Sequence, residues 1–94
     1  MIVYQELNSL KSYYKGKIYE IENNFVPSEF LVGGYTLVYL DANKNIKVFQ
    51  NGKSKIVNYG SQFQVNDFDL VNNVIIFNIG VNTNLIYYND QLYE

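Results

Sequence analysis

Short apolar segments alternate with turn-forming residues along the whole chain. The clearest example runs from residue 35 to 65, where segments rich in Val, Ile, Phe and Tyr are separated by ANKN, NG and YGS. The apolar residue types suit a pleated sheet, and the separating residues are typical of turns. No window places apolar residues at helical spacing over two turns, so we expect essentially no helix. The strands predicted in this stretch are Tyr35–Asp41, Asn45–Asn51, Ser54–Tyr59 and Gln62–Val65.

These elements recur along the chain. KVFQNGK at 47–53 matches KSYYKGK at 11–17 with an offset of 36 residues, and NKNIKVFQN at 43–51 matches NTNLIYYND at 82–90 with an offset of 39. A further element, SEFLVGG, resembles SQFQVND 33 residues later. The sequence therefore predicts a single all-β unit over residues 1–94. It contains about two and a half repeats, at roughly 1–34, 35–69 and 70–94.

Each copy centres on a two-residue turn. Asn51-Gly52 is a favoured pair for a type I′ hairpin, because both central residues need a positive φ. Lys15-Gly16 and Asn89-Asp90 fall at the same place in the other two copies. The sequence thus predicts three hairpins of one kind.

The apolar pattern inside the strands predicts burial on both faces. YTLVYL and NVIIF are nearly continuous apolar runs, whereas a strand with one wet face alternates apolar and polar residues. Small sheets that stack face against face bury both sides. Four-stranded antiparallel units of about 40 residues, stacked in this way, form β-propellers.

The unit VGGYTLVYLDANKNIKVFQNGKSKIVNYGSQF resembles the blades of the β-propeller superfamily. It is most similar to bacterial repeats of the pattern vgd-nlvay-d-n-n-lkvfyngk-yel. The resemblance covers almost the whole chain and rests on repeat period, strand count and turn position. The WD and Gly-His signatures of WD40 blades and the paired signature of kelch blades are absent. The resemblance implies an all-β fold of antiparallel four-stranded propeller-type blades, incomplete in one chain, and it implies no activity.

Two and a half blades cannot close a propeller, which needs four or more. Either the chain is one part of a larger propeller, or copies associate, with a dimer favoured because two chains would supply about five blades. A small barrel or sandwich is the remaining alternative. An open stack would leave 91–94 as an exposed sheet edge, and such edges pair with other chains.

Composition excludes several classes of function. The net charge is −2, with seven Lys residues, no Arg and no basic block, so we expect no nucleic-acid partner. No apolar run approaches the roughly 18 residues of a membrane span. IVYQELN, which follows Met1, lacks the features of a secretory signal. Without Cys or His, neither a disulfide nor a Cys–His or Ser–His–Asp arrangement can form. We expect no cofactor, and the composition leaves the cellular compartment open.

DANKN at 41–45 matches the opening of a calcium loop, which would make Asp41, Asn43 and Asn45 metal ligands. The glycine that should follow is Ile46, and Gly52 stands where the closing carboxylate should be. The favoured interpretation is a turn in which Asp and Asn side chains bond their own backbone.

Asp67 and Asp69 form an acidic pair, with Glu29 at a nearby repeat position. Such a pair could act in acid–base chemistry or bind a ligand or hard metal ion. DFDLVNN is predicted to be an insertion in the second repeat, on a loop that leads into an innermost strand. A solvated loop is the favoured alternative.

The tyrosines support a further hypothesis. SYYKGKIYE and IYYNDQLYE are similar to the aromatic hairpins of glycan-binding repeats, whose exposed rings stack on sugars. The alignment places Tyr13, Phe49 and Tyr88 at one repeat position, which predicts a shared role in packing. The better candidates for exposure and ligand binding are Tyr14, Tyr59 and Tyr87.

The sequence thus favours a non-catalytic propeller-type scaffold that presents loops to a protein or glycan partner. It would be completed by self-association or by further blades. The alternative is a Tyr-rich carbohydrate-binding repeat protein of another all-β shape. A carboxylate-based hydrolase that uses Asp67 and Asp69 is the third class.

Overall fold

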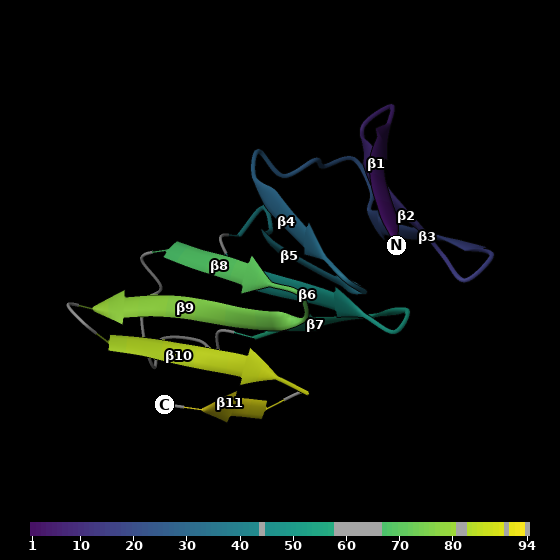
Figure 1. Cartoon of the computed structure of the whole chain (residues 1–94). Coiled ribbons are helices and arrows are strands. Elements are labelled where there is room, and N and C mark those ends of the chain that lie inside the picture. The colour runs from purple at the N-terminus through teal and green to yellow at the C-terminus, as the bar shows by residue number, and fades with distance from the viewer. Residues whose placement is uncertain (44, 58–66, 81–82, 90, 94) are drawn as a thin grey trace.

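The computed structural model shows an all-β chain, as the sequence predicts (Figure 1). It describes residues 1–43, 45–57, 67–80, 83–89 and 91–93. Within these ranges all elements of regular secondary structure are strands, and they form three antiparallel sheets. The first sheet holds β1 (Ile2–Glu6), β2 (Ser9–Tyr14) and β3 (Lys17–Glu22). The middle sheet holds β4 (Phe30–Gly33), β5 (Thr36–Leu40), β6 (Ile46–Gln50) and β7 (Lys53–Ile56). The last sheet holds β8 (Asp67–Val71), β9 (Val74–Gly80), β10 (Thr83–Tyr88) and β11 (Gln91–Tyr93).

Consecutive strands pair throughout each sheet, and tight turns connect the best-matched pairs. Lys15 and Gly16, between β2 and β3, have φ values of 51° and 76°. Asn51 and Gly52, between β6 and β7, have φ values of 52° and 76°. These positive values are those of a type I′ turn. The hairpins predicted at these two turns are confirmed.

The segment DFDLVNN is a strand, so the prediction of an insertion loop there is wrong. Asp67–Val71 forms β8 and pairs with β9. Its apolar and polar residues alternate, so that Phe68 and Leu70 face the core while both aspartates face outward. β4 is the corresponding strand of the middle sheet and pairs with β5. The predicted strand Gln62–Val65 lies outside the described residues.

The offset between the middle and last sheets is 38 residues at the turn, one fewer than predicted. Asn51, with φ 52°, corresponds to Asn89, with φ 50°. Tyr87 therefore takes the position of Phe49, and the predicted match to Tyr88 is wrong. Because side chains alternate between the two faces of a strand, this one-residue difference moves a side chain to the opposite face.

With this register, each face of one sheet has an equivalent face in the other two sheets. We call them the front and the back. The front carries Tyr13, Phe49 or Tyr87, and the back carries Ser12, Val48 or Ile86.

The back of the first sheet packs on the front of the middle sheet. Leu10 from the first sheet is buried with Leu37, Tyr39 and Phe49 from the middle sheet. The Tyr19 ring of β3 meets Phe49 edge-on, with 5.3 Å between centroids and 64° between planes. This geometry is a favourable one for two aromatic rings.

The back of the middle sheet packs on the front of the last sheet. This second core contains Val38, Ile46, Val48 and Val57 of the middle segment and Ile75, Phe77, Leu85 and Tyr87 of the last sheet. Figure 1 shows the first and last sheets on different sides of the middle sheet.

Burial on both faces is therefore confirmed for the middle sheet, where 36–39 are all buried. For NVIIF the prediction is wrong within this chain. Ile75 and Phe77 on the front are buried, whereas Val74 and Ile76 on the back are only half-buried.

Candidate functional site

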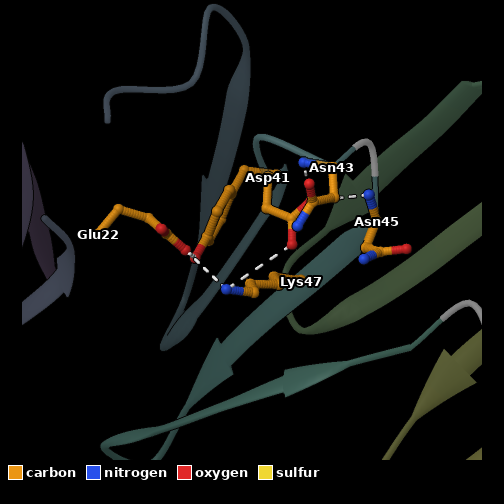
Figure 2. Close-up of polar contacts among 6 residues, drawn as sticks. Glu22, Asp41, Asn43, Asn45 and Lys47 are labelled. Carbon is orange, nitrogen blue, oxygen red and sulfur yellow. Dashed lines mark hydrogen bonds and ion pairs between the residues drawn. The ribbon is translucent and has the colours of Figure 1, made fainter. Parts of the chain in front are cut away.

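A polar cluster lies at the contact between the first and middle sheets (Figure 2). The Tyr39 hydroxyl of β5 donates to Glu22 Oε2, at the end of β3, over 2.5 Å. Lys47 Nζ of β6 donates to the same oxygen over 3.0 Å and lies 3.7 Å from Asp41 Oδ2. Because Glu22 belongs to the first sheet and its partners belong to the middle sheet, the cluster links the two sheets.

Tyr39 is fully buried in this cluster. Burial raises the pKa of its phenol above the ordinary value of 10.0, and the hydrogen bond to Glu22 raises that pKa further. The negative charges of Glu22 and Asp41 act in the same direction. Tyr39 is therefore a neutral hydrogen-bond donor near neutral pH. It is poorly suited to proton transfer there, because an efficient catalytic acid or base has a pKa near the working pH.

The proposed metal ligands at 41–45 form a closed turn. Asp41 Oδ1 accepts hydrogen bonds from the backbone N–H groups of Asn43 and Asn45, each over 2.9 Å. The other Asp41 oxygen faces the Lys47 ammonium, as Figure 2 shows. This is the turn in which an Asp side chain bonds its own backbone. Among the described residues, no three Asp, Glu, His or Cys side chains cluster as a metal site requires.

A second polar link joins the middle and last sheets. Asn73 Oδ1, in the turn between β8 and β9, accepts hydrogen bonds from the Tyr35 N–H and the Thr36 hydroxyl, each over 2.9 Å. Gln50 Nε2 in turn donates to Thr36 Oγ1 over 2.7 Å. Gly34 has a φ of +56°, and a Cβ there would lie 2.6 Å from Asn73 Oδ1. A side chain at position 34 would therefore displace Asn73 from this link.

Asp67 and Asp69 lie on the same face of β8 and are both exposed. They point to the back of the last sheet, away from the second core. Asp69 Oδ1 accepts a hydrogen bond from the Leu70 N–H over 2.8 Å. The two carboxylates therefore stand side by side at a sheet edge instead of facing each other across a cleft.

The three tyrosines predicted to be exposed for ligand binding differ in their positions in the structure. Tyr87 is only 2 % exposed and belongs to the second core, so its predicted exposure is wrong. The reason is the register, which gives Tyr87 the packing position and leaves Tyr88 exposed. Tyr14 is half-buried at the end of β2, with Lys15 Nζ 5.4 Å from its ring centroid. Tyr59 lies outside the described residues.

Exposed apolar side chains gather on the two outer sheet faces. On the front of the first sheet, Ile2, Tyr13 and Ile18 are 62 %, 46 % and 60 % exposed. On the back of the last sheet, Val71, Ile86 and Tyr93 are 54 %, 38 % and 47 % exposed. In the middle sheet the counterparts of Ile2, Tyr13 and Ile86, which are Leu37, Phe49 and Val48, are buried. The counterparts of Ile18 and Tyr93, which are Ser54 and Lys55, are exposed.

The front of β4 is uncovered as well. Phe30 and Val32 are exposed, whereas the corresponding Phe68 and Leu70 of β8 pack against the second core. In the described part of the chain, no strand precedes β1 in the first sheet, so none faces β4.

A family model for a 10-bladed beta propeller domain matches residues 1–93. The chain belongs to this 10-bladed β-propeller family. The three sheets are propeller blades, and their front-to-back packing is the contact between neighbouring blades. The match removes a barrel, a sandwich or a carbohydrate-binding repeat of another all-β shape as descriptions of the fold. No curated protein and no solved structure matched the chain. The described residues include no helix long and apolar enough to cross a membrane.

The residues that link the propeller blades were not identified as functional from the sequence. Glu22, Lys47 and Asn73 act between blades, and their partners are far away in the chain. One signal was available. Tyr4 and Lys11 are cross-strand neighbours in the first blade, as Tyr39 and Lys47 are in the middle blade. The Tyr–Lys pair recurs on the front of the first two blades, whereas the last blade has Phe77 and Leu85 at these positions.

Proposed function

We propose that the chain is a non-catalytic propeller scaffold that presents its loops to a protein or glycan partner. Further blades complete it, supplied by another copy or by the remainder of a longer chain. The observation that carries this proposal is the pair of uncovered apolar faces on the outer blades. Part of each face corresponds to residues that are buried in the middle blade, and exposed apolar patches of this kind mark interaction surfaces.

The absence of a catalytic role is supported by what the polar groups do. The buried Tyr39 and Asp41 and the half-buried Lys47 bond to one another, to Glu22 or to the backbone. Asp67 and Asp69 sit side by side on a sheet edge. A hydrolase that uses two carboxylates needs them on either side of the scissile bond, several ångströms apart. Replacing both aspartates with asparagine should leave folding and partner binding intact. Loss of a measurable turnover in that variant would support the enzyme class instead.

Light scattering at two protein concentrations, with a fluorescent apolar dye such as anilinonaphthalene sulfonate, tests the scaffold proposal. We expect either a species heavier than the 11.0 kDa of one chain or a monomer that enhances the dye fluorescence. Both results follow from open blade faces, because such a face is either covered by another chain or exposed to water, where it binds the dye. A folded monomer at both concentrations that does not enhance the dye fluorescence would contradict the proposal.

The exposed tyrosines favour a glycan as a second kind of partner. Tyr13, Tyr88 and Tyr93 present their rings on the outer blade faces. Titration with neutral oligosaccharides, followed by tyrosine fluorescence, distinguishes the two partners. Saturable quenching indicates a glycan, and an unchanged signal indicates that the loops serve a protein.

A further inference from the structure

The contact between the middle and last blades is closed at one side and open at the other. At the closed side β4 and β8 contact each other, and a Cβ at Gly33 would lie 2.6 Å from the Asn72 carbonyl oxygen. At the open side a groove of about 550 Å³ lies between the β6–β7 hairpin and β10. Val48 and Tyr87, both buried, line it from the two blades. Its size is within the range of about 300–1,000 Å³ that is typical of small-molecule sites.

An aromatic ring fills the equivalent space between the first and middle blades. Tyr19 is the cross-strand neighbour of Ser12 on the back of the first blade. Its ring meets Phe49 edge-on, and a Cβ at Gly52 would lie 2.9 Å from its hydroxyl oxygen. Tyr19 therefore occupies the space between β3 and the β6–β7 turn of the next blade.

The middle blade has a lysine at the repeat position of this ring. Lys55 is the cross-strand neighbour of Val48 on the back of the middle blade, so it corresponds to Tyr19. It lines the groove together with Tyr87. The last blade has an aromatic residue again, Tyr93, at the same position. The groove is therefore found where the chain departs from the aromatic residue of its own repeat.

A second lysine lines the same groove. Lys53 lies two residues before Lys55 on β7, so both side chains point to the same face of the strand, and both are exposed. Lys53 makes no ion pair with another described residue. Among the described residues that line the groove, none is acidic. The groove thus presents two positive charges and attracts a negatively charged group.

The rest of the lining suits a sugar ring with hydroxyl groups. Asn51, in the turn, and Gln50, next to it, contribute side-chain amides, which both donate and accept hydrogen bonds. The Gln50 Nε2 donates to Thr36 Oγ1, which leaves the Gln50 oxygen as an acceptor. Val48 and Tyr87 give the groove an apolar floor. An apolar surface with a few polar groups around it is the usual composition of a small-molecule site.

We propose that this groove binds an acidic sugar residue, with its negative group at Lys53 and Lys55 and its hydroxyls at Asn51 and Gln50. This inference rests on the proposed function, because it names the class of glycan partner and the place where it binds. Both walls of the groove belong to described blades. The site therefore does not depend on which blades precede or follow them.

Isothermal titration calorimetry with four matched probes tests the ligand class. Trigalacturonate and a sulfated maltotriose are the acidic sugars, and the methyl ester of trigalacturonate is the neutral sugar. Triglutamate with blocked termini carries the same charges as trigalacturonate on a peptide. We expect at least one acidic sugar to bind saturably, and the neutral ester and the peptide to bind at least about tenfold more weakly, because both the charge and the hydroxyls are recognised.

Three variants test the place. Lys53→Gln should weaken the binding of the acidic sugar by about fivefold, because an exposed charge pair is lost. Lys55→Tyr introduces the residue of the other two blades and should abolish binding by filling the groove. Lys17→Gln is the matched control, since Lys17 has the repeat position of Lys53 in the first blade and its Nζ lies 5.2 Å from the Tyr19 ring centroid. It should bind as the wild type does.

Circular dichroism shows whether each variant is folded. Because Lys53 is exposed, Lys53→Gln keeps the test decisive if Lys55→Tyr fails to fold. An equal loss in Lys53→Gln and Lys17→Gln would mean that the whole surface attracts the anion, and the groove would be excluded as the site.

Three other results would overturn the inference without overturning the proposed function. If the neutral ester binds as tightly as trigalacturonate, the negative group is not recognised, and a neutral glycan remains the partner. If the peptide binds more tightly, the partner is a protein. If no probe binds, the groove takes no acidic sugar, and light scattering with the apolar dye still decides the scaffold proposal by itself.

Discussion

At the residue scale, the contacts between blades depend on a few polar side chains held within apolar surroundings. Tyr39 and Asn73 are each paired across a blade contact. Ser12 is different, because it is fully buried on the back of the first blade and its hydroxyl has no partner among the described residues. The corresponding residue of the middle blade is Val48. Burial of an unpaired polar group costs free energy, so the serine weakens the contact that it sits in.

We expect Ser12→Ala to raise the free energy of unfolding by about 1 kcal/mol, because it removes an unpaired buried hydroxyl. Urea denaturation followed by circular dichroism measures this change. Ser54→Ala is a suitable control, since Ser54 is exposed on β7 and its replacement should be neutral. A clear loss of stability in Ser12→Ala would mean that the hydroxyl has a partner in solution.

Tyr39 links stability to pH. Its folded-state pKa is raised above the ordinary value of 10.0. The stability that it contributes is therefore fully present below about pH 10 and is lost as the pH rises from there toward the folded-state pKa. Tyr39→Phe should cost about 1–2 kcal/mol at neutral pH, because Glu22 loses a donor.

As the pH rises from about 9 to 11, the free energy of unfolding of Tyr39→Phe should fall less than that of the wild type. Urea denaturation across this range measures the difference. Tyr88→Phe is the matched control, since Tyr88 is exposed and should leave the pH profile unchanged. Identical profiles for Tyr39→Phe and the wild type would contradict the buried hydrogen bond.

At the scale of the element, turns decide the fold. Strands and turns could be predicted from sequence because their signals are local: Asn51-Gly52 needs only its own backbone preferences. The strand β8 was missed because its two aspartates suggest a loop, while the alternation of Phe68 and Leu70 is short. The register of the last blade was missed because two alignments that differ by one residue both match aromatic residues. Only the buried contacts of Tyr87 decide between them.

Two glycines in turns should respond differently to alanine. Gly16 and Gly34 both have positive φ, but only Gly34 has a neighbour, Asn73, within 4 Å of the added Cβ. Gly16→Ala should cost about 1 kcal/mol, the backbone penalty alone. Gly34→Ala should cost more, because Asn73 must also leave Tyr35 and Thr36. Thermal or urea denaturation ranks the two variants, and equal losses would mean that the Asn73 link is absent.

At the scale of the whole molecule, the described residues form three blades that stack front to back, with exposed apolar side chains on the two outer faces. The family resemblance and the apolar run of the middle blade predicted this architecture, because the repeat period and the two-sided burial of β5 are readable from sequence. The links between blades could not be predicted. Glu22 meets Lys47, and Asn73 meets Tyr35, only after the blades have packed.

Hydroxyl-radical footprinting read by mass spectrometry tests this order most directly. Tyr87 and Tyr88 are adjacent and chemically identical, so their labelling rates report burial alone. We expect Tyr87 to be protected, while Tyr88 and Tyr13, which are both exposed, are labelled more rapidly. Rapid labelling of Tyr87 together with protection of Tyr88 would contradict the front-to-back stacking of the blades.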